Sequence, residues 1–423
     1  MTKINLLYDI SVLGAAAVDN RSRTGVYAVI KNLVNGLADN PEIDLTLTSE
    51  PELMKFSLSC YKNSSFRNAG FKAHQDILCN YDSQDECGTT RKNLNYLRRF
   101  LLRASNICNH KKINVDIFHS TFFKIPDFIQ NIPDIKKVIT IYDLIPILHP
   151  EYFTESRPEF FKTIIKSIKS ENYVISISQS TRNDLCNYLP SVSPDNVKVI
   201  YPAASSLFHK VNDQVRINFV KNKYKIPNEP YILSLCTLEP RKNIALLIRA
   251  FRSLIETEKI PLNLVLVGGK GWKYDSIFAE ISKNKSKNRI FLTGYALDGD
   301  LASIYSGAMM FVYPSIFEGF GLPPLEAMQC EIPVITSNAS SLPEVVGDAG
   351  IMVDPHDQDG LAQSILNLFK DSNLRATLSQ RSKKQAAKFN WKNNIDETVD
   401  FYKEILRPKQ QSCLEGIEAL NDR

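Results

Sequence analysis

Short apolar runs alternate with amphipathic stretches along most of this chain, and this alternation restricts its fold more than any other feature. Short apolar runs between turn-forming residues are typical of buried strands, whereas apolar residues spaced three and four apart are typical of helices. Regular strand–helix alternation predicts parallel sheets covered by helices, an α/β fold. In the first half we predict strands at residues 4–8, 44–47, 117–119, 137–141, 173–177 and 197–201, and helices at 26–37 and 181–188.

The alternation stops near residues 202–214 and then restarts, which indicates a second sheet. We therefore expect two Rossmann-like domains, residues 1–205 and 206–390, with a loop-rich insert at about 55–95 in the first. Ligands of such sheets bind at the carboxyl ends of the strands, so we expect the active site in a cleft between the domains. The second series predicts strands at 231–236, 262–267, 290–292, 310–313, 334–336 and 350–353, and helices at 244–256, 300–306, 324–330, 358–370, 373–388 and 391–406.

The composition excludes several classes of protein. The 423 residues include 51 Lys+Arg and 46 Asp+Glu, a formal net charge of +5, and 43% are hydrophobic. This balance is ordinary for a globular protein and excludes disorder over the bulk of the chain. The basic residues are mostly interspersed with acids, whereas a nucleic-acid binder usually gathers them in a stripe, so we expect no nucleic-acid partner.

The start of the chain and its cysteines favour a cytoplasmic location. Residues 4–9 are too short an apolar run for a signal peptide, and no run reaches the ~18 apolar residues of a membrane-spanning helix. The eight cysteines form no CxxC pair. Residues 91–112 place leucines among arginines, as in an amphipathic helix. Two interpretations remain open for this stretch, peripheral contact with anionic lipid headgroups or packing on a sheet.

Residues 311–337 contain the most informative motif. A strand is followed by Glu318-Gly319-Phe320-Gly321-Leu322, two prolines and a helix that carries Glu326 in its expected first turn. Glycines before a helix start favour an anion, because free N–H groups and the positive end of the helix dipole face it. A carboxylate there can accept the two hydroxyls of a ribose or merely cap the helix, and the sequence leaves both interpretations open.

The next most informative motif is a pair of basic residues that follows a predicted strand. Arg241 and Lys242 lie in the loop after residues 231–236, where adjacent cations can hold a diphosphate. A solvated charge pair is the alternative, although cations at a helix start oppose its dipole. The glycines of 268–271 predict a tight turn with close backbone approach, and Gly25, before the first long helix, could approach a phosphate or simply end a flexible loop.

Other candidate site residues carry weaker signals. Asp298 and Asp300 match the D-x-D pattern of some sugar transferases, but they stand at an expected helix start, and we predict no metal there. The histidines form no zinc-ligand pattern, and no G-x-S-x-G elbow indicates a hydrolase. His119 ends a strand at the carboxyl edge, whereas we expect His149 to be structural.

In this order and at these separations the motifs resemble those of retaining glycosyltransferases of family 4, which have the GT-B fold. The resemblance covers nearly the whole chain and is strongest from Tyr231 to Tyr402. It implies that residues 391–423 include a closing helix that packs back on the first domain. Its motifs are EGFGLPPLEAM at 318–328, LEPRKN at 238–243, VGG at 267–269, GYALDGDLASIYSGA at 294–308, LPEVVGDAGIMVDPHD at 342–357, RTGVYAVIKNL at 23–33 and TIYDLIPILHPEYF at 140–153.

The resemblance implies roles for individual residues. Arg241 and Lys242 would hold the donor diphosphate and stabilise the leaving group, and Glu318 would contact the donor sugar. Glu326 would accept the ribose hydroxyls. The remaining donor contacts would come from the backbone at Phe320, Gly321 and Leu322, from Gly25 and from Tyr295.

One position departs from the family pattern. Many members have a histidine near the reaction centre where this chain has Tyr142, directly before Asp143. We therefore expect Asp143, with Glu318, Arg241 and Lys242, among the catalytic residues, and Asp143, Tyr142 and His119 on the acceptor side. The identity of an acid or base residue stays open.

The N-terminal motifs resemble those of bacterial enzymes of surface polysaccharide synthesis, many of which use GDP-mannose. The resemblance predicts metal-independent, retaining transfer of a hexose, mannose first, from a GDP-linked rather than a UDP-linked donor. The acceptor would be a saccharide or a lipid-linked molecule. No cofactor is expected. The alternatives are a silent sugar-nucleotide-binding scaffold and a transferase acting on a protein or small molecule.

Overall fold

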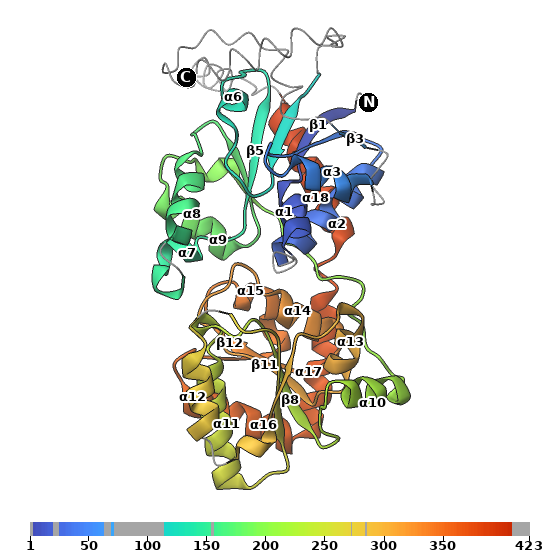
Figure 1. Ribbon diagram of the computed structural model, residues 1–423, viewed down its shortest axis with the longest axis vertical. Coiled ribbons are helices and arrows are strands. Elements are labelled where there is room, and N and C mark those ends of the chain that lie inside the picture. The colour runs from blue at the N-terminus through green and yellow to red at the C-terminus, as the bar shows by residue number, and fades with distance from the viewer. Residues whose placement is uncertain are drawn as a thin grey trace, which may run out of the picture. The chain divides into compact units, whose positions relative to one another are not determined.

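The computed structural model describes residues 3–19, 25–62, 69–71, 114–153, 156–271, 273–283 and 286–407. The chain divides into two compact units, one reaching to Val138 and resuming at Tyr402, the other containing Ile139–Phe401. Parallel strands covered by helices form both units (Figure 1), so the predicted α/β architecture is confirmed. The domain boundaries at 205 and 390 stay a prediction.

Seven strands form the first sheet, in the order β3-β2-β1-β4-β5-β6-β7. Strand β1 pairs in parallel with β2 on one side and β4 on the other, with Leu6 opposite both Leu45 and Ile117. Leu6 and Leu7 point to opposite faces and are both buried, as expected where helices cover both faces of a parallel sheet. The strands are β1 Ile4–Asp9, β2 Ile43–Thr48, β3 Gly70–Phe71, β4 Ile117–Ser120, β5 Lys136–Ile141, β6 Tyr173–Ser176 and β7 Val197–Val199.

Six strands form the second sheet, in the order β10-β9-β8-β11-β12-β13. The chain runs outward from β8 to β10 and then returns to the other side of β8, so the strand order reverses between β8 and β11. A crevice for a ligand forms at such a switch point in open α/β sheets. The strands are β8 Tyr231–Leu235, β9 Asn263–Val267, β10 Ile290–Gly294, β11 Met310–Tyr313, β12 Val334–Ser337 and β13 Ile351–Val353.

The helices carry their apolar residues on one side. In α11 these are spaced three and four apart, as in Leu247, Phe251 and Leu254, and all three are buried. The helices are α1 Ser11–Val18, α2 Gly25–Asp39, α3 Met54–Lys62, α6 Asp127–Gln130, α7 Ile145–Leu148, α8 Ser156–Lys166, α9 Gln179–Tyr188, α10 Gln214–Lys223, α11 Ile244–Glu258, α12 Asp275–Lys283, α13 Asp298–Ser306, α14 Leu322–Gln329, α15 Leu342–Val346, α16 Gln358–Lys370, α17 Ser372–Ala386 and α18 Trp391–Leu406. Short 3₁₀ turns lie at Pro150–Tyr152, Pro194–Asn196, Pro240–Lys242, Lys287–Arg289 and Gly347–Ala349.

One local prediction is wrong. Helix α14 begins at Leu322, directly after Gly321 with its φ of +121°, so Glu326 lies in the second turn rather than the first. Helix α3 occupies the start of the expected loop-rich insert; it packs on α1 where a Cβ on Gly14 would lie 2.2 Å from Ser57 Oγ. Gly14 and Ser57 are small, so their contact gives the sequence no run of large apolar residues that would predict a helix. The rest of the insert apart from residues 69–71, and the basic stretch 91–112, lie outside the described residues.

The end of α18 contacts the first sheet. Tyr402 Oη lies 2.6 Å from Nδ1 of His119 on β4, and Lys403 Nζ lies 2.8 Å from a carboxylate oxygen of Glu42. Both the imidazole and the phenol are buried. Within the described part of the chain, no helix has the length and apolar character needed to cross a bilayer.

Candidate active site

The strongest group of predicted site residues lies where β8 and β11 end, at the switch point of the second sheet. Arg241 and Lys242 form a 3₁₀ turn after β8, and Glu318 lies in the loop after β11. The following Asn243 adopts a left-handed conformation with φ 59°, and its side-chain amide donates to the carbonyls of Pro314 and Pro355. These bonds fix the basic loop against the loop that carries Glu318.

Glu318 binds both cations. Its Oε1 accepts from Lys242 Nζ at 2.6 Å, and its Oε2 lies 2.9 Å from Arg241 Nη1. The same Oε1 accepts from the hydroxyls of Ser315 at 2.6 Å and Tyr313 at 2.9 Å. Burial alone would raise the pKa of Glu318, but the charges of Arg241 and Lys242 outweigh burial and lower this pKa to about 2. The carboxylate is therefore ionised throughout the neutral range.

Arg241 bridges two acids. Its Nη2 donates to Glu239 Oε1 at 2.6 Å and its Nη1 to the carbonyl of Phe317 at 2.5 Å. Burial would lower its pKa, but Glu318 and Glu239 raise it. Its Nε–H is buried and has no hydrogen-bond partner among the described residues. Two cations and two carboxylates thus form a group without net charge. An incoming anion would add a negative charge and an acceptor for the buried Arg241 Nε–H.

The glycine turn after β9 supports the basic loop. The carbonyl of Gly269 accepts from the Leu238 N–H and the Gly271 N–H donates to the Leu238 carbonyl, both at 3.0 Å. At Gly268, with φ +139°, a Cβ would lie 1.9 Å from the Cys236 carbonyl oxygen. The predicted close backbone approach is confirmed, and the element approached is the segment leading to Arg241.

Asp143 lies beside this cluster. A Cβ on Gly319 would lie 2.4 Å from the Tyr142 carbonyl oxygen and 3.1 Å from Asp143 Cβ, so the two backbones touch. Asp143 Oδ1 accepts from the Ile145 N–H at 3.0 Å. Burial raises the pKa of Asp143, with Arg241 lowering it and Glu318 raising it further. The structure therefore brings Asp143 together with Glu318 and Arg241, while the Tyr142 side chain is buried.

Glu326 lies apart from that cluster on α14. Its carboxylate accepts from the Tyr305 hydroxyl at 2.9 Å. Burial raises the pKa of Glu326 to about 7, and the charge of Asp298 adds to the effect. Tyr295 is 71% exposed, and its hydroxyl lies 3.4 Å from Asp298 Oδ1. Asp298 thus contacts the exposed Tyr295 side chain and acts on Glu326 through its charge.

The remaining predicted residues are placed as follows. Phe320 is buried against Tyr201 and Phe389, Gly321 has positive φ, and Leu322 begins α14. Gly25 begins α2 and, with His119, belongs to the other compact unit. Burial lowers the pKa of His119 to about 3, so its imidazole is neutral.

The two aspartates of the D-x-D pattern stand in the first turn of α13, as expected. Asp300 is buried and binds Arg216 and Lys223, each at 2.6 Å, together with the Tyr224 hydroxyl at 2.9 Å. Tyr224 in turn accepts the Leu297 N–H at 3.0 Å, so α10 holds the loop that carries Tyr295. Among the described residues, no three His, Cys, Asp or Glu side chains gather as a metal site.

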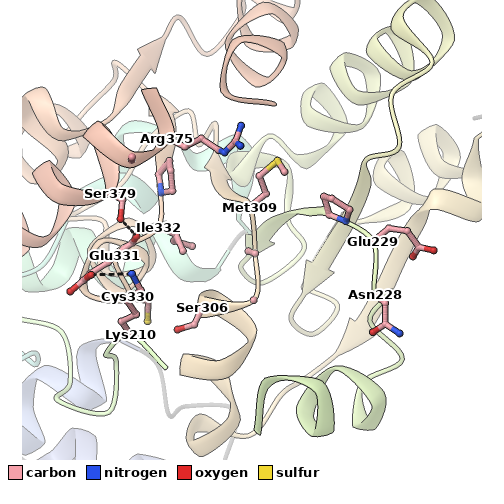
Figure 2. Close-up of a pocket in the computed structure, with 15 residues that line it drawn as sticks. Lys210, Asn228, Glu229, Ser306, Met309, Cys330, Glu331, Ile332, Arg375 and Ser379 are labelled. Carbon is pink, nitrogen blue, oxygen red and sulfur yellow. Dashed lines mark hydrogen bonds and ion pairs between the residues drawn. The ribbon is translucent and has the colours of Figure 1, made fainter. Parts of the chain in front are cut away.

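A separate pocket of about 500 Å³ opens at the opposite edge of the second sheet. Its wall includes Pro230, Met309 and Pro333, each directly before a strand, and the pair Lys210–Glu331 at 3.4 Å (Figure 2). None of the predicted site residues lines it. The pocket therefore lies at the amino ends of the strands, away from the cations at their carboxyl ends.

Sequence reasoning missed Glu239, Tyr313 and Ser315 as members of the cluster. Glu239 lies within the LEPRKN motif, and the other two lie at the end of β11 and just after it. Their positions at the carboxyl ends of β8 and β11 could have indicated them. Each contacts a partner in its own loop, Arg241 for Glu239 and Glu318 for the other two. The meeting of the two loops depends on the pairing of β8 with β11, which only the sheet order supplies.

Several known proteins and one protein family are similar to this chain. The family described as glycosyl transferases group 1 matches residues 216–385. The O-antigen chain mannosyltransferase B of Escherichia coli is 34% identical over 288 residues, 68% of this chain and 74% of that protein. The serotype-specific mannosyltransferase WbdA of Escherichia coli is 32% identical over 300 residues, 70% of this chain but 36% of that longer protein.

Solved structures share the fold. Sucrose-phosphate synthase from Thermosynechococcus elongatus superposes with a TM-score of 0.67 at 19% identity, over 95% of this chain and 99% of that one. Anabaena Alr3699/HepE in complex with UDP and glucose gives 0.66 at 15% identity, over 95% and 100%. With the two parallel sheets, these likenesses confirm the predicted GT-B fold.

Proposed function

Because this chain belongs to the group 1 glycosyltransferases, we propose that it transfers mannose from a GDP-linked donor, with retention of configuration, in the synthesis of a surface glycan. The acceptor is a saccharide or a lipid-linked saccharide. The relative named O-antigen chain mannosyltransferase B, 34% identical, supports both the sugar and the pathway. The resemblance of the N-terminal motifs to polysaccharide enzymes that use GDP-mannose supports the choice of nucleotide.

The observation that carries the proposal is the pair Arg241 and Lys242 at the switch point, both bound to buried Glu318. In the proposed reaction the bond between the sugar carbon and the phosphate oxygen breaks, and a bond to the acceptor oxygen forms. Negative charge develops on the departing diphosphate. Fixed cations in a partly dry site stabilise such charge at no cost in reorganisation. The buried Arg241 Nε–H is a further donor that a phosphate oxygen can satisfy.

The remaining donor contacts follow from the residues around this pair. We assign the ribose hydroxyls to Glu326 and the base to the loop that carries Tyr295. Asp143 and Glu318 are assigned to the transferred sugar, next to the cations. The acceptor proton passes to the departing phosphate, which becomes more basic as the bond breaks. We propose that Arg241 and Lys242 supply the positive charge that a metal provides in other sugar transferases.

The first experiment identifies the nucleotide. Thermal unfolding is measured with GDP, UDP, ADP or dTDP, each with and without EDTA. A ligand at 100 times its Kd adds about 2.7 kcal/mol to the free energy of unfolding, an easily measured shift. The proposal expects stabilisation by GDP that EDTA leaves unchanged. Stabilisation by another nucleotide alone, or loss of the GDP effect in EDTA, would contradict the proposed donor or the metal-free clamp.

The second experiment tests transfer. GDP-mannose and UDP-glucose are offered with lipid-linked saccharide acceptors, and the anomeric configuration of the product is read by NMR. Lys370→Ala, which breaks an exposed ion pair with Glu258, serves as the matched lysine control for Lys242→Ala. Transfer from GDP-mannose with inverted configuration would overturn the retaining assignment. Transfer only from UDP-glucose would overturn the donor assignment.

A further inference from the structure

The short helix α15 carries a carboxylate that caps another helix. Glu344 Oε2 accepts from the Gln179 N–H and its Oε1 from the Ser180 N–H, each at 2.7 Å. These are the first two N–H groups of α9, and the Ser178 hydroxyl accepts the next one, from Thr181, at 3.0 Å. The first N–H groups of a helix have no partner within it. Here a residue 165 positions away satisfies two of them.

A second group of contacts ties the same segment to the active-site loop. Ser341 Oγ donates to the carbonyl of Phe320 at 2.6 Å, with the Glu318 carbonyl 3.0 Å from the same oxygen. Ser340, in a left-handed conformation with φ 56°, accepts the Glu318 N–H at 3.2 Å. The segment from Ser340 to Glu344 therefore binds the backbone of the Glu318 loop at one end and α9 at the other.

The first turn of α9 also contacts the loop that carries Glu318. The buried hydroxyl of Thr181 lies 3.2 Å from the carbonyl oxygen of Tyr142 and 3.3 Å from that of Gly319. Tyr142 directly precedes Asp143, and Gly319 directly follows Glu318. Thr181 thus sits over the point where the two backbones touch. Any displacement of the first turn of α9 moves the hydroxyl that joins them.

We propose that Glu344 is a positioning residue for glycosyl transfer: by capping α9 it holds Thr181 over the Tyr142–Gly319 junction and so fixes Asp143 relative to Glu318. The role rests on the active site proposed above, although Glu344 itself touches no reacting group. A carboxylate is well suited to it, because two oxygens can accept from two consecutive N–H groups and its charge favours a helix N-terminus. The LPEVV sequence of α15 therefore carries a residue that positions the active site.

The kinetic test compares wild type, Glu344→Ala, Glu344→Gln, Thr181→Val and the double variant Glu344→Ala/Thr181→Val. We expect Glu344→Ala to lower kcat at least about tenfold, since small misplacements of reacting groups cost that much or more. The Kd of the nucleotide should stay within about twofold, because the cations remain in place. Glu344→Gln keeps one acceptor oxygen and should lose less activity. Asp371→Ala is the matched control, because Asp371 also caps a helix, α17, through the Leu374 N–H at 2.9 Å.

The double variant separates positioning from general loss of stability. If Glu344 acts through Thr181, the double variant should be no slower than the slower single one. Multiplying losses would overturn the proposal, as would an unchanged kcat in Glu344→Ala or a Kd that rises in step with the fall in kcat. A loss as large in Asp371→Ala would assign the effect to stability.

A measurement without substrate keeps this inference separate from the proposed function. Amide hydrogen exchange is followed in wild type and Glu344→Ala. Faster exchange is expected at Gln179 and Ser180 and also in segments 142–145 and 318–321. Faster exchange confined to α9 would refute the positioning role, even if the enzyme used an unexpected donor. If the wild type transfers no sugar, yet Glu344→Ala shows faster exchange in all of these segments, only the proposed function is refuted.

Discussion

Replacing Glu318 with glutamine tests whether this carboxylate holds Arg241 and Lys242 inside the protein. The change keeps the shape of the side chain but removes its charge. Arg241 and Lys242 have side chains 12% and 11% exposed; Arg241 would keep its ion pair with Glu239, whereas Lys242 would lose its ion pair with Glu318. Removing one partner of a buried ion pair typically costs about 3–5 kcal/mol of stability. Glu318→Gln should therefore lower the free energy of unfolding by about that amount at pH 7.

The pKa of Glu318 gives an independent magnitude. It falls from the ordinary 4.5 to about 2 in the folded protein, and each unit of pKa corresponds to 1.36 kcal/mol. The carboxylate therefore contributes about 3 kcal/mol above pH 4.5. Because the folded pKa is the lower one, this contribution falls as the pH falls from 4.5 toward 2. By pH 3 about 2 kcal/mol of it should be lost.

The assay is urea unfolding of wild type and Glu318→Gln at several pH values from 7 to 3. The difference between the two proteins should be about 3 kcal/mol at pH 7 and should shrink by about 2 kcal/mol at pH 3. Glu258→Gln, which removes the carboxylate of an exposed pair with Lys370, should change stability by less than about 1 kcal/mol. A Glu318→Gln difference that is equally large at pH 3 and pH 7 would refute the reasoning from charge.

Three further changes test other parts of the site. Lys242→Ala should lower kcat about 10²-fold or more, the cost of losing one fixed donor to developing negative charge; sugar-transfer kinetics near the wild-type level would remove it from the diphosphate clamp. Gly319→Ala places a methyl group 2.4 Å from the Tyr142 carbonyl oxygen and should abolish transfer with an unchanged circular dichroism spectrum, whereas normal turnover would contradict the close contact. The pKa of Glu326 near 7 predicts that the donor KM falls as the pH rises through 7, because the ionised carboxylate is the better acceptor for ribose hydroxyls; the same pH profile in Glu326→Gln would exclude this residue as its cause.

The sheets could be predicted because their signal is local. A parallel strand covered on both faces needs apolar residues at successive positions, so Leu6 and Leu7 mark β1 without any knowledge of its neighbours. The tight turn at residues 268–271 could likewise be predicted, from its glycines alone. Helix α1 was not, because SVLGAAAV is apolar or small throughout and has no amphipathic period.

The site was predicted as a set of residue types rather than as a set of contacts. The E-x7-E spacing and the adjacent cations indicated candidate site residues, and the family resemblance implied that Glu318 contacts the donor sugar, but neither indicated its ion pairs with Arg241 and Lys242. Its ion pairs with Arg241 and Lys242 depend on strand order, whereas its hydroxyl partners Tyr313 and Ser315 lie close to it in the sequence. The cap that Glu344 places on α9 joins residues 165 positions apart, and no local pattern reports such a contact. Glu326 was placed in the first turn because the helix was expected to begin at residue 324, whereas α14 begins at Leu322.

The hydrogen bond between His119 and Tyr402 has a consequence for how the protein is made. The two residues are 283 positions apart, so during synthesis the imidazole on β4 has no Tyr402 partner until those further residues have been added. At 5–20 residues per second the wait is about 15–60 s. The first sheet therefore cannot complete its interior until Tyr402 has been added, although β1 and β4 are synthesised long before. A chain released before Tyr402 would keep an unfinished core and become a substrate for chaperones and proteases.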